Sequence, residues 1–158
     1  MVLGEHGTGK TTTVQKVCNE IGKGIIYLTV PEDVAKFGNA FAQAIGVYYH
    51  QQDDGIFSHI HKLVFGPEQG IIVHLILVLS WDDVYDTFKK YADWYRKENN
   101  RASVIVIDNI NILAKKAPEI LEILQGGAKA AVGSGLYTAV FVTSDGSAPS
   151  QMRGNFGF

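Results

Sequence analysis

The sequence predicts an α/β protein in which helices cover both faces of a mainly parallel β-sheet, a three-layer α/β/α architecture. Runs of β-branched residues alternate with segments of helical periodicity along the chain, and this alternation is typical of parallel sheets connected by helices. Two further observations point to the same class: a glycine-rich loop stands directly before the first helical segment, and a carboxylate ends one of the apolar runs. Ligands of such folds bind at the carboxyl ends of the strands, so we expect a binding site at that edge.

Size and composition indicate a single globular domain spanning residues 1–158. Of the 158 residues, 46% are hydrophobic, which is enough for one substantial core but not for two ordinary domains. The net charge of −2 provides no global basic field, so nucleic acid is not supported as a partner. Cys18 is the only cysteine, which excludes an internal disulfide framework and favours a reducing intracellular compartment, with the cytoplasm as the expected location.

The N-terminal end has no charged start followed by an apolar stretch, so no signal peptide is predicted. The longest apolar run, residues 71–81, contains His74 and is too short to span a bilayer. We therefore expect a protein that does not insert into a membrane.

The glycine-rich loop, GEHGTGKTT at residues 4–12, matches the pattern G-x-x-x-x-G-K-[ST] of a phosphate-binding P-loop. Glycine allows positive φ angles, so that several backbone N–H groups can surround anionic oxygens. Lys10 would lie near the β- and γ-phosphates, and the hydroxyl of Thr11 would bind Mg²⁺, which prefers oxygen ligands. A plain connecting turn is less favoured because the motif is complete and a helix follows it. The residues expected to contact the nucleotide are Gly4, Glu5, His6, Gly7, Thr8, Gly9, Lys10, Thr11 and Thr12.

The first helix is predicted from apolar residues at i, i+3, i+4 and i+7, and Gly22 is its stop signal. These residues are Val14, Val17, Cys18 and Ile21. The N-terminal end of this helix would add to the phosphate site. Residues 24–30 (GIIYLTV) are typical of a strand buried on both faces. A second helix is expected between Pro31 and Gly46, with an apolar face formed by Val34, Phe37, Phe41 and Ile45.

Residues 47–70 are less regular, with a polar loop, a short helix in IFSHIHKLVF and a break at GPEQG. The run 71–80 fits either an additional buried strand or a short core helix. His59 and His61 are spaced i, i+2, which would put both on one face of a strand, and Asp53 and Asp54 are nearby in the sequence. Without a third defined ligand, an ordinary polar surface is favoured over a metal site.

A long helix is predicted over WDDVYDTFKKYADWYRKENN, residues 81–100, because acidic residues come first, basic residues come last, and apolar side chains recur at helical spacing. The aromatic rings could alternatively form a base-stacking platform, but such platforms usually come with a basic groove. Core packing is therefore favoured for this stripe, which consists of Trp81, Val84, Tyr85, Phe88, Tyr91, Ala92 and Tyr95.

Two further predicted strands end in polar residues. ASVIVIDNIN places four β-branched residues before Asp108, so a buried strand is expected to bring a carboxylate to the carboxyl edge of the sheet. The alternative is that Asp108 only caps the end of this strand. A helix is expected over PEILEILQGGAKAAVGSG, with an interruption near Gly126 and Gly127 left open. The last strand, YTAVFVTSDG, ends in the polar residues 143–145.

With GEHGTGKT, VIVIDN and VFVTSDG in this order, the chain resembles P-loop ATPases of the AAA+ and STAND-like group, especially archaeal-type ATPase domains. The resemblance covers most of residues 1–145 and implies a P-loop NTPase fold in which the sensor strand, residues 137–143, lies between the P-loop strand and the strand of Asp108. Relatives have a longer first strand and further elements after the sensor. The resemblance therefore implies truncation at both ends, with a core at 1–145 and an incomplete C-terminal part starting at 146–158. Residues 71–80 match nothing expected in the family and are interpreted as an insertion or a mistaken segment of the gene model.

The resemblance also implies roles for individual residues. Asp108 resembles the Walker B aspartate that holds Mg²⁺ together with Thr11, and Thr143 or Ser144 resembles the sensor of the γ-phosphate. Many relatives follow the aspartate with a glutamate that activates the attacking water, but Asn109 stands here, and an amide cannot accept that proton. It could still orient a water. The catalytic candidates are Lys10, Asp108, Asn109 and Thr143. Arg153 is the best candidate for an arginine that contacts the γ-phosphate, although an ordinary surface role is slightly favoured.

These features predict Mg²⁺-dependent ATP binding with slow hydrolysis, in a nucleotide-driven switch or motor module that acts through a protein partner or a missing C-terminal domain, with homo-oligomers as an option. The alternative is a non-hydrolysing nucleotide-binding scaffold for protein assembly, which Asn109 favours. A P-loop kinase is less favoured, because such enzymes usually need a lid with several basic residues, and Arg153 is the only arginine beyond Arg101. The sequence leaves the preference between ATP and GTP open.

Overall fold

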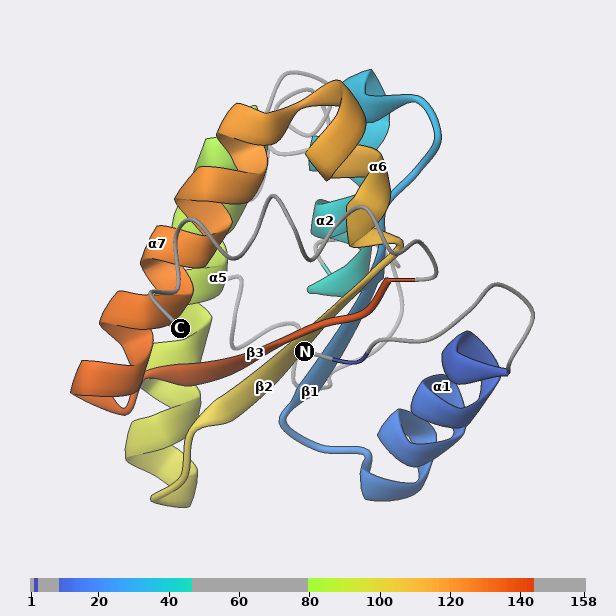
Figure 1. Cartoon of the computed structure of the whole chain (residues 1–158). Coiled ribbons are helices and arrows are strands. Elements are labelled where there is room, and N and C mark those ends of the chain that lie inside the picture. Colours follow the sequence, from blue (N-terminus) through green and yellow to red (C-terminus); the bar gives the residue numbers. More distant parts are fainter. Residues whose placement is uncertain (1, 3–8, 47–79, 144–158) are drawn as a thin grey trace, which may run out of the picture.

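The computed structural model describes residues 2, 9–46 and 80–143, in which an open parallel sheet has helices on both faces (Figure 1). This arrangement confirms the predicted α/β class and its three layers. In chain order the elements are α1 (Lys10–Ile21), β1 (Ile25–Thr29), the 3-10 helix η1 (Val34–Lys36), α2 (Phe37–Ala44), α5 (Trp81–Asn99), β2 (Ser103–Asp108), α6 (Ile110–Lys116), α7 (Pro118–Ser134) and β3 (Tyr137–Phe141).

The three strands lie in the order β1-β2-β3, and both pairs are parallel. Thr29, the last residue of β1, lies opposite Asp108, the last residue of β2. On the other side of β3, Val2 forms a parallel bridge with Val142. The strand with the predicted sensor therefore lies between β2 and the chain segment that precedes the P-loop, as the family resemblance implied.

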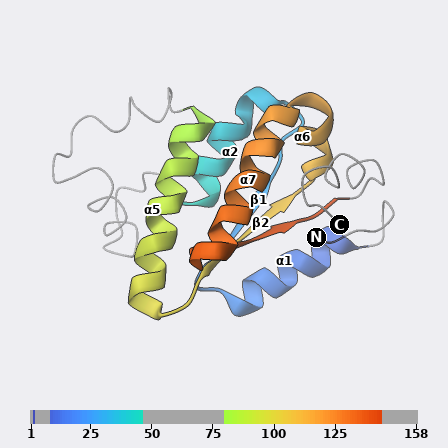
Figure 2. The same ribbon diagram turned by 60° about the vertical axis from the view of Figure 1, so that its left-hand side comes forward.

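Helices α2, α5 and α7 cover one face of the sheet, and α1 covers the other (Figures 1 and 2). Side chains alternate between the two faces along a strand. Accordingly, Ile105 and Ile107 of β2 belong to the large core cluster on the first face, whereas Val106 packs with Cys18 of α1 and with Val142 on the second. The middle strand is buried on both faces, which explains its unbroken run of apolar residues.

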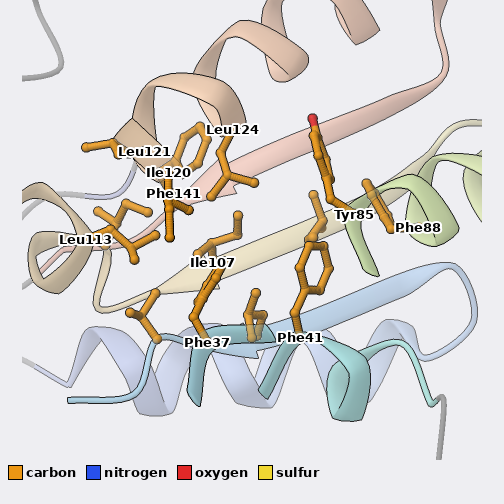
Figure 3. Packing of buried hydrophobic residues seen from close by; sticks show 14 of the residues in the cluster. Phe37, Phe41, Tyr85, Phe88, Ile107, Leu113, Ile120, Leu121, Leu124 and Phe141 are labelled. Atoms are coloured by element: carbon orange, nitrogen blue, oxygen red, sulfur yellow. The ribbon is translucent and has the colours of Figure 1, made fainter. Parts of the chain in front are cut away.

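The aromatic stripe of α5 packs against the core as predicted, and all of its members except Tyr95 pack in or against the large cluster. Phe88 is fully buried, and its ring lies edge-on to Tyr137 with centroids 4.8 Å apart and 6.0 Å from the ring of Phe41. Figure 3 shows the rings of Phe41, Tyr85 and Phe88 between the sheet and the helices. Each aromatic pair contributes about 0.5–1.5 kcal/mol beyond the burial of its area, so the stripe stabilises the fold and is not available to stack on bases.

Helix α7 runs without interruption from Pro118 to Ser134, so the break considered near Gly126 and Gly127 does not occur. Gly127 has a packing role instead. A Cβ at this position would overlap the Tyr85 hydroxyl and lie 3.1 Å from the Tyr137 hydroxyl, and these two hydroxyls share a hydrogen bond of 2.7 Å. The absence of a side chain lets α7 approach this buried pair.

The helix predicted from Pro31 begins later than expected. The carboxylate of Asp33 accepts a hydrogen bond of 3.2 Å from the N–H of Ala35 and caps η1, and α2 starts only at Phe37. Sequence reasoning also missed α6, a helix of seven residues directly after Asn109. Both differences concern helices of eight residues or fewer, in which one or two turns give little periodicity to detect.

The apolar face of α1 is narrower than predicted. Cys18 is buried and Val14 is partly buried, whereas Val17 and Ile21 are 46% and 58% exposed. Val14 and Cys18 lie one turn apart on the same line of the helix, and this line meets the sheet. Val17 and Ile21 lie on the flank beside it.

Several predictions concern residues outside the described ranges. They are the P-loop residues Gly4, Glu5, His6, Gly7 and Thr8, the short helix within 47–70, residues 71–79, the polar groups Asp53, Asp54, His59 and His61, and the candidates Ser144 and Arg153. The division into a core and a C-terminal part stays a prediction. Among the helices within residues 9–46 and 80–143, none is both long and apolar enough to cross a membrane.

Candidate functional site

The described end of the P-loop motif stands at the start of α1. Gly9 has φ 75° and ψ 11°, a left-handed conformation that favours glycine, and its carbonyl accepts the hydrogen bond of 2.9 Å from the N–H of Thr13. Lys10 and Thr11 follow in the first turn, with Lys10 half-buried and Thr11 exposed. The N-terminal end of α1 points toward the carboxyl ends of the strands (Figures 1 and 2), where its positive dipole end would favour an anion.

Asp108 ends the middle strand and is almost completely buried, with 1% of its surface exposed. Its carboxylate accepts two hydrogen bonds. The Tyr27 hydroxyl donates to Oδ2 at 2.5 Å, and the backbone N–H of Asn109 donates to Oδ1 at 2.8 Å. A buried carboxylate is costly without such partners, and bonds of this kind to a charged acceptor are among the stronger ones in proteins.

Tyr27 is held in its protonated, donating form. Burial is the largest cause that raises the pKa of its phenol, and the hydrogen bond to Asp108 and the negative charge of that carboxylate raise it further. The ordinary tyrosine pKa is about 10, so the phenol keeps its proton at neutral pH. Oδ2 of Asp108 therefore faces a fixed donor.

Asn109 follows Asp108 in the left-handed conformation, with φ 60° and ψ 36°. Asparagine adopts this conformation more readily than most residues. The turn directs the chain from β2 into α6, whose first N–H, that of Ile110, donates to the carbonyl of Val142 at 3.1 Å. The start of α6 is thereby tied to the end of the sensor strand.

Thr143 is buried two residues after the end of β3, with 1% exposure. Its hydroxyl donates to Oδ1 of Asn111 in α6 across a long distance of 3.4 Å, and its N–H donates to the carbonyl of Val2 at 3.2 Å. The predicted sensor thus connects the segment before the P-loop with the helix that follows Asp108.

The structure therefore brings Asp108, Asn109 and Thr143 together at one edge of the sheet. Lys10 and Thr11 lie in the first turn of α1. This helix packs on the sheet face to which Val106 points, because Cys18 of α1 belongs to the same cluster as Val106. Tyr27 and Asn111 are also at this edge and were not predicted. Tyr27 was hidden within an apolar strand, where a tyrosine ordinarily indicates packing, and Asn111 lies in the helix that periodicity did not reveal.

The chemistry of these side chains suits Mg²⁺, which prefers oxygen ligands and commonly keeps several waters. The two carboxylate oxygens of Asp108 offer about four acceptor positions, so each can accept a further partner beside its present hydrogen bond. The hydroxyl of Thr11 would add a neutral oxygen. Within residues 9–46 and 80–143, no group of three or more histidine, cysteine, aspartate or glutamate side chains forms an all-protein metal site, so a metal here would depend on water or phosphate for its remaining ligands.

Comparisons with known proteins agree with the fold and identify its family. The chain is similar in fold to Cdc6p from Pyrobaculum aerophilum, with a TM-score of 0.52 and 19% sequence identity, and the likeness covers 99% of this chain and 36% of that protein. No curated protein matches the sequence. The model of the ATPase family associated with various cellular activities (AAA) matches residues 1–140. Because this match covers most of the chain, the protein belongs to the AAA family of ATPases.

Proposed function

We propose that the protein binds ATP together with Mg²⁺, hydrolyses it slowly and acts as a nucleotide-driven switch or motor module. Membership of the AAA family supports a nucleotide-driven activity in general. The observation that carries the proposal is the buried carboxylate of Asp108 at the carboxyl edge of the middle strand, on the sheet face that α1 covers. In open α/β sheets this edge is where ligands bind.

The individual roles follow from chemistry and position. Lys10 would contact the β- and γ-phosphates. Thr11 and Asp108 would hold Mg²⁺, which would neutralise charge on the phosphate oxygens. Thr143 would sense the γ-phosphate, and its link to Asn111 gives a route by which this contact could move α6. The state of the nucleotide would then be read by a protein partner or by another domain.

Slow hydrolysis is proposed because of Asn109. Its side chain is an amide, which cannot take a proton from water, and its left-handed backbone is well suited to asparagine. A water oriented by this amide would react without a strong general base, and general bases contribute about 10²–10⁴-fold to rate. The same observation favours the second candidate function, a nucleotide-binding scaffold for protein assembly that does not hydrolyse ATP.

The first experiment measures nucleotide binding by the whole chain and by two lysine variants. Lys10→Ala should abolish most of the affinity for Mg²⁺-ATP in calorimetric titration, because the lysine serves the phosphates. Lys16→Ala is the matched control: this lysine is exposed on the same helix and pairs weakly with Glu20 at 4.0 Å. It should bind as the unmodified chain does. A parallel titration with Mg²⁺-GTP determines the base preference.

Thermal unfolding and phosphate release complete the test. Ligand at about 100 times its dissociation constant should stabilise the unmodified chain by about 2.7 kcal/mol, which corresponds to a rise in Tm of roughly 5–11 °C for a domain of this size. Folded Lys10→Ala with unchanged ATP affinity would refute the P-loop assignment. Binding without phosphate release would favour the scaffold over the switch.

A further inference from the structure

Tyr27 lies at the candidate site but belongs to none of its sequence motifs. It is opposite Val106 in the register of β1 and β2, and Val106 precedes Asp108 by two residues. Residues two apart on a strand lie on the same face, so Tyr27 and Asp108 share the sheet face that α1 covers. The phenol extends diagonally across the two strands, and its hydroxyl reaches Oδ2 of Asp108 at 2.5 Å.

The two donors around Asp108 restrain the direction of its carboxylate. Tyr27 holds Oδ2 from the neighbouring strand, and the N–H of Asn109 holds Oδ1 from the backbone. A single donor would leave the carboxylate free to rotate about its terminal torsion, which is broad for aspartate. Donors on both oxygens define this rotation, and with it the direction of the lone pairs that remain for a cation.

We propose that Tyr27 is a positioning residue that orients Asp108 for Mg²⁺. This inference rests on the proposed function, in which Asp108 is a ligand of the metal. Groups that hydrogen-bond to metal ligands fix the orientation of those ligands, and their loss typically lowers metal affinity or activity about 10–100-fold. A purely structural tyrosine would affect the stability of the fold but would leave the binding of the metal unchanged.

The test compares Tyr27→Phe with Tyr137→Phe, which serves as the matched control. Each variant loses one phenol hydroxyl that makes a short hydrogen bond in the described part of the chain, and Tyr137 lies at the opposite end of the sheet, beside Ser103. Urea unfolding establishes that both variants fold. Binding of ATP by the whole chain is then measured by calorimetry in excess EDTA and in a series of Mg²⁺ concentrations.

For Tyr27→Phe we expect the affinity for ATP in EDTA to change by no more than about twofold, because the lysine and the backbone amides of the P-loop are intact. The apparent dissociation constant of Mg²⁺ in the presence of ATP should rise about 10–100-fold. For Tyr137→Phe neither quantity should change. Unchanged or tighter Mg²⁺ binding by Tyr27→Phe would overturn the inference.

Asp108→Asn separates a failure of this inference from a failure of the proposed function. If Asp108→Asn weakens Mg²⁺ binding and Tyr27→Phe does not, the metal ligand is correct and the role of Tyr27 is refuted. If neither variant changes Mg²⁺ binding, Asp108 is not the ligand, and the inference fails together with the metal assignment. A chain that binds no ATP in EDTA or Mg²⁺ refutes the proposed function itself.

Discussion

Replacing Gly127 by alanine tests the close contact between α7 and the core. Alanine is ordinarily more favourable than glycine in a helix interior by about 1 kcal/mol. Gly126 should show this gain, because a Cβ there would have nothing within 4 Å. At Gly127 the added methyl would overlap the Tyr85 hydroxyl and lie 2.9 Å from Cζ of the same ring. Adjacent glycines of one helix are therefore expected to respond with opposite signs.

The size of the effect follows from three contributions. Forcing a methyl group into a packed core costs about 1–3 kcal/mol. Displacing Tyr85 also breaks its hydrogen bond of 2.7 Å with Tyr137 and leaves buried hydroxyls unpaired, which costs about 1–3 kcal/mol. The helix propensity of alanine offsets about 1 kcal/mol. We expect Gly127→Ala to lower the free energy of unfolding by roughly 3 kcal/mol and Tm by roughly 6–12 °C.

Urea unfolding of the whole chain measures these differences. Tyr85→Phe removes the oxygen that the new methyl would overlap, so Gly127→Ala should cost less in the Tyr85→Phe background than in the unmodified chain. A coupling energy of at least about 0.5 kcal/mol is expected for two sites in contact. The packing explanation is refuted if Gly127→Ala stabilises the chain as Gly126→Ala does, or if its effect simply adds to that of Tyr85→Phe.

Two further predictions concern the site and the buried phenols. Asn109→Glu should raise the rate of phosphate release on the order of 10²-fold if a water is already positioned. The same substitution should lower the stability of the fold by about 1 kcal/mol, because position 109 has a left-handed backbone that asparagine adopts more readily than glutamate. Nucleotide affinity must be measured in parallel, because a second carboxylate beside Asp108 can disturb the binding of the metal. If the unmodified chain hydrolyses ATP rapidly and the substitution does not change this rate, another residue is the base. For Tyr137, burial and then the hydrogen bond with Tyr85 raise the pKa of the phenol. The protonated phenol of Tyr137 therefore contributes its full stabilisation below the pKa of tyrosine in the unfolded chain, about 10. As pH rises above this value the stabilisation is lost, by up to about 1.4 kcal/mol per pH unit. Tyr137→Phe should flatten this decline in urea unfolding between about pH 9.5 and 11, and parallel curves for the two chains would contradict the assignment.

Much of the fold was predictable because it depends on residues that are close in the chain. The P-loop spacing before α1, the apolar run of β2 and the helical stripe of α5 are local patterns, and the structure has these elements where they were expected. The position of the sensor strand, between β2 and the segment before the P-loop, followed from the family resemblance. The roles of Lys10, Thr11, Asp108 and Thr143 stay predictions until binding is measured.

By itself, the sequence determined the class of the fold, the phosphate-binding pattern and a carboxylate at the end of a buried strand. Only the tertiary structure decided which groups meet at that carboxylate. Tyr27 and Asp108 are 81 residues apart, and Thr143 and Asn111 are 32 residues apart, so no spacing rule connects them. Likewise, Gly127 resembled a helix breaker until the Tyr85 and Tyr137 hydroxyls were seen to occupy the space beside it. The physical reason is the same in each case: the register of parallel strands and the packing of helices bring distant residues into contact, and local periodicity carries no information about that register.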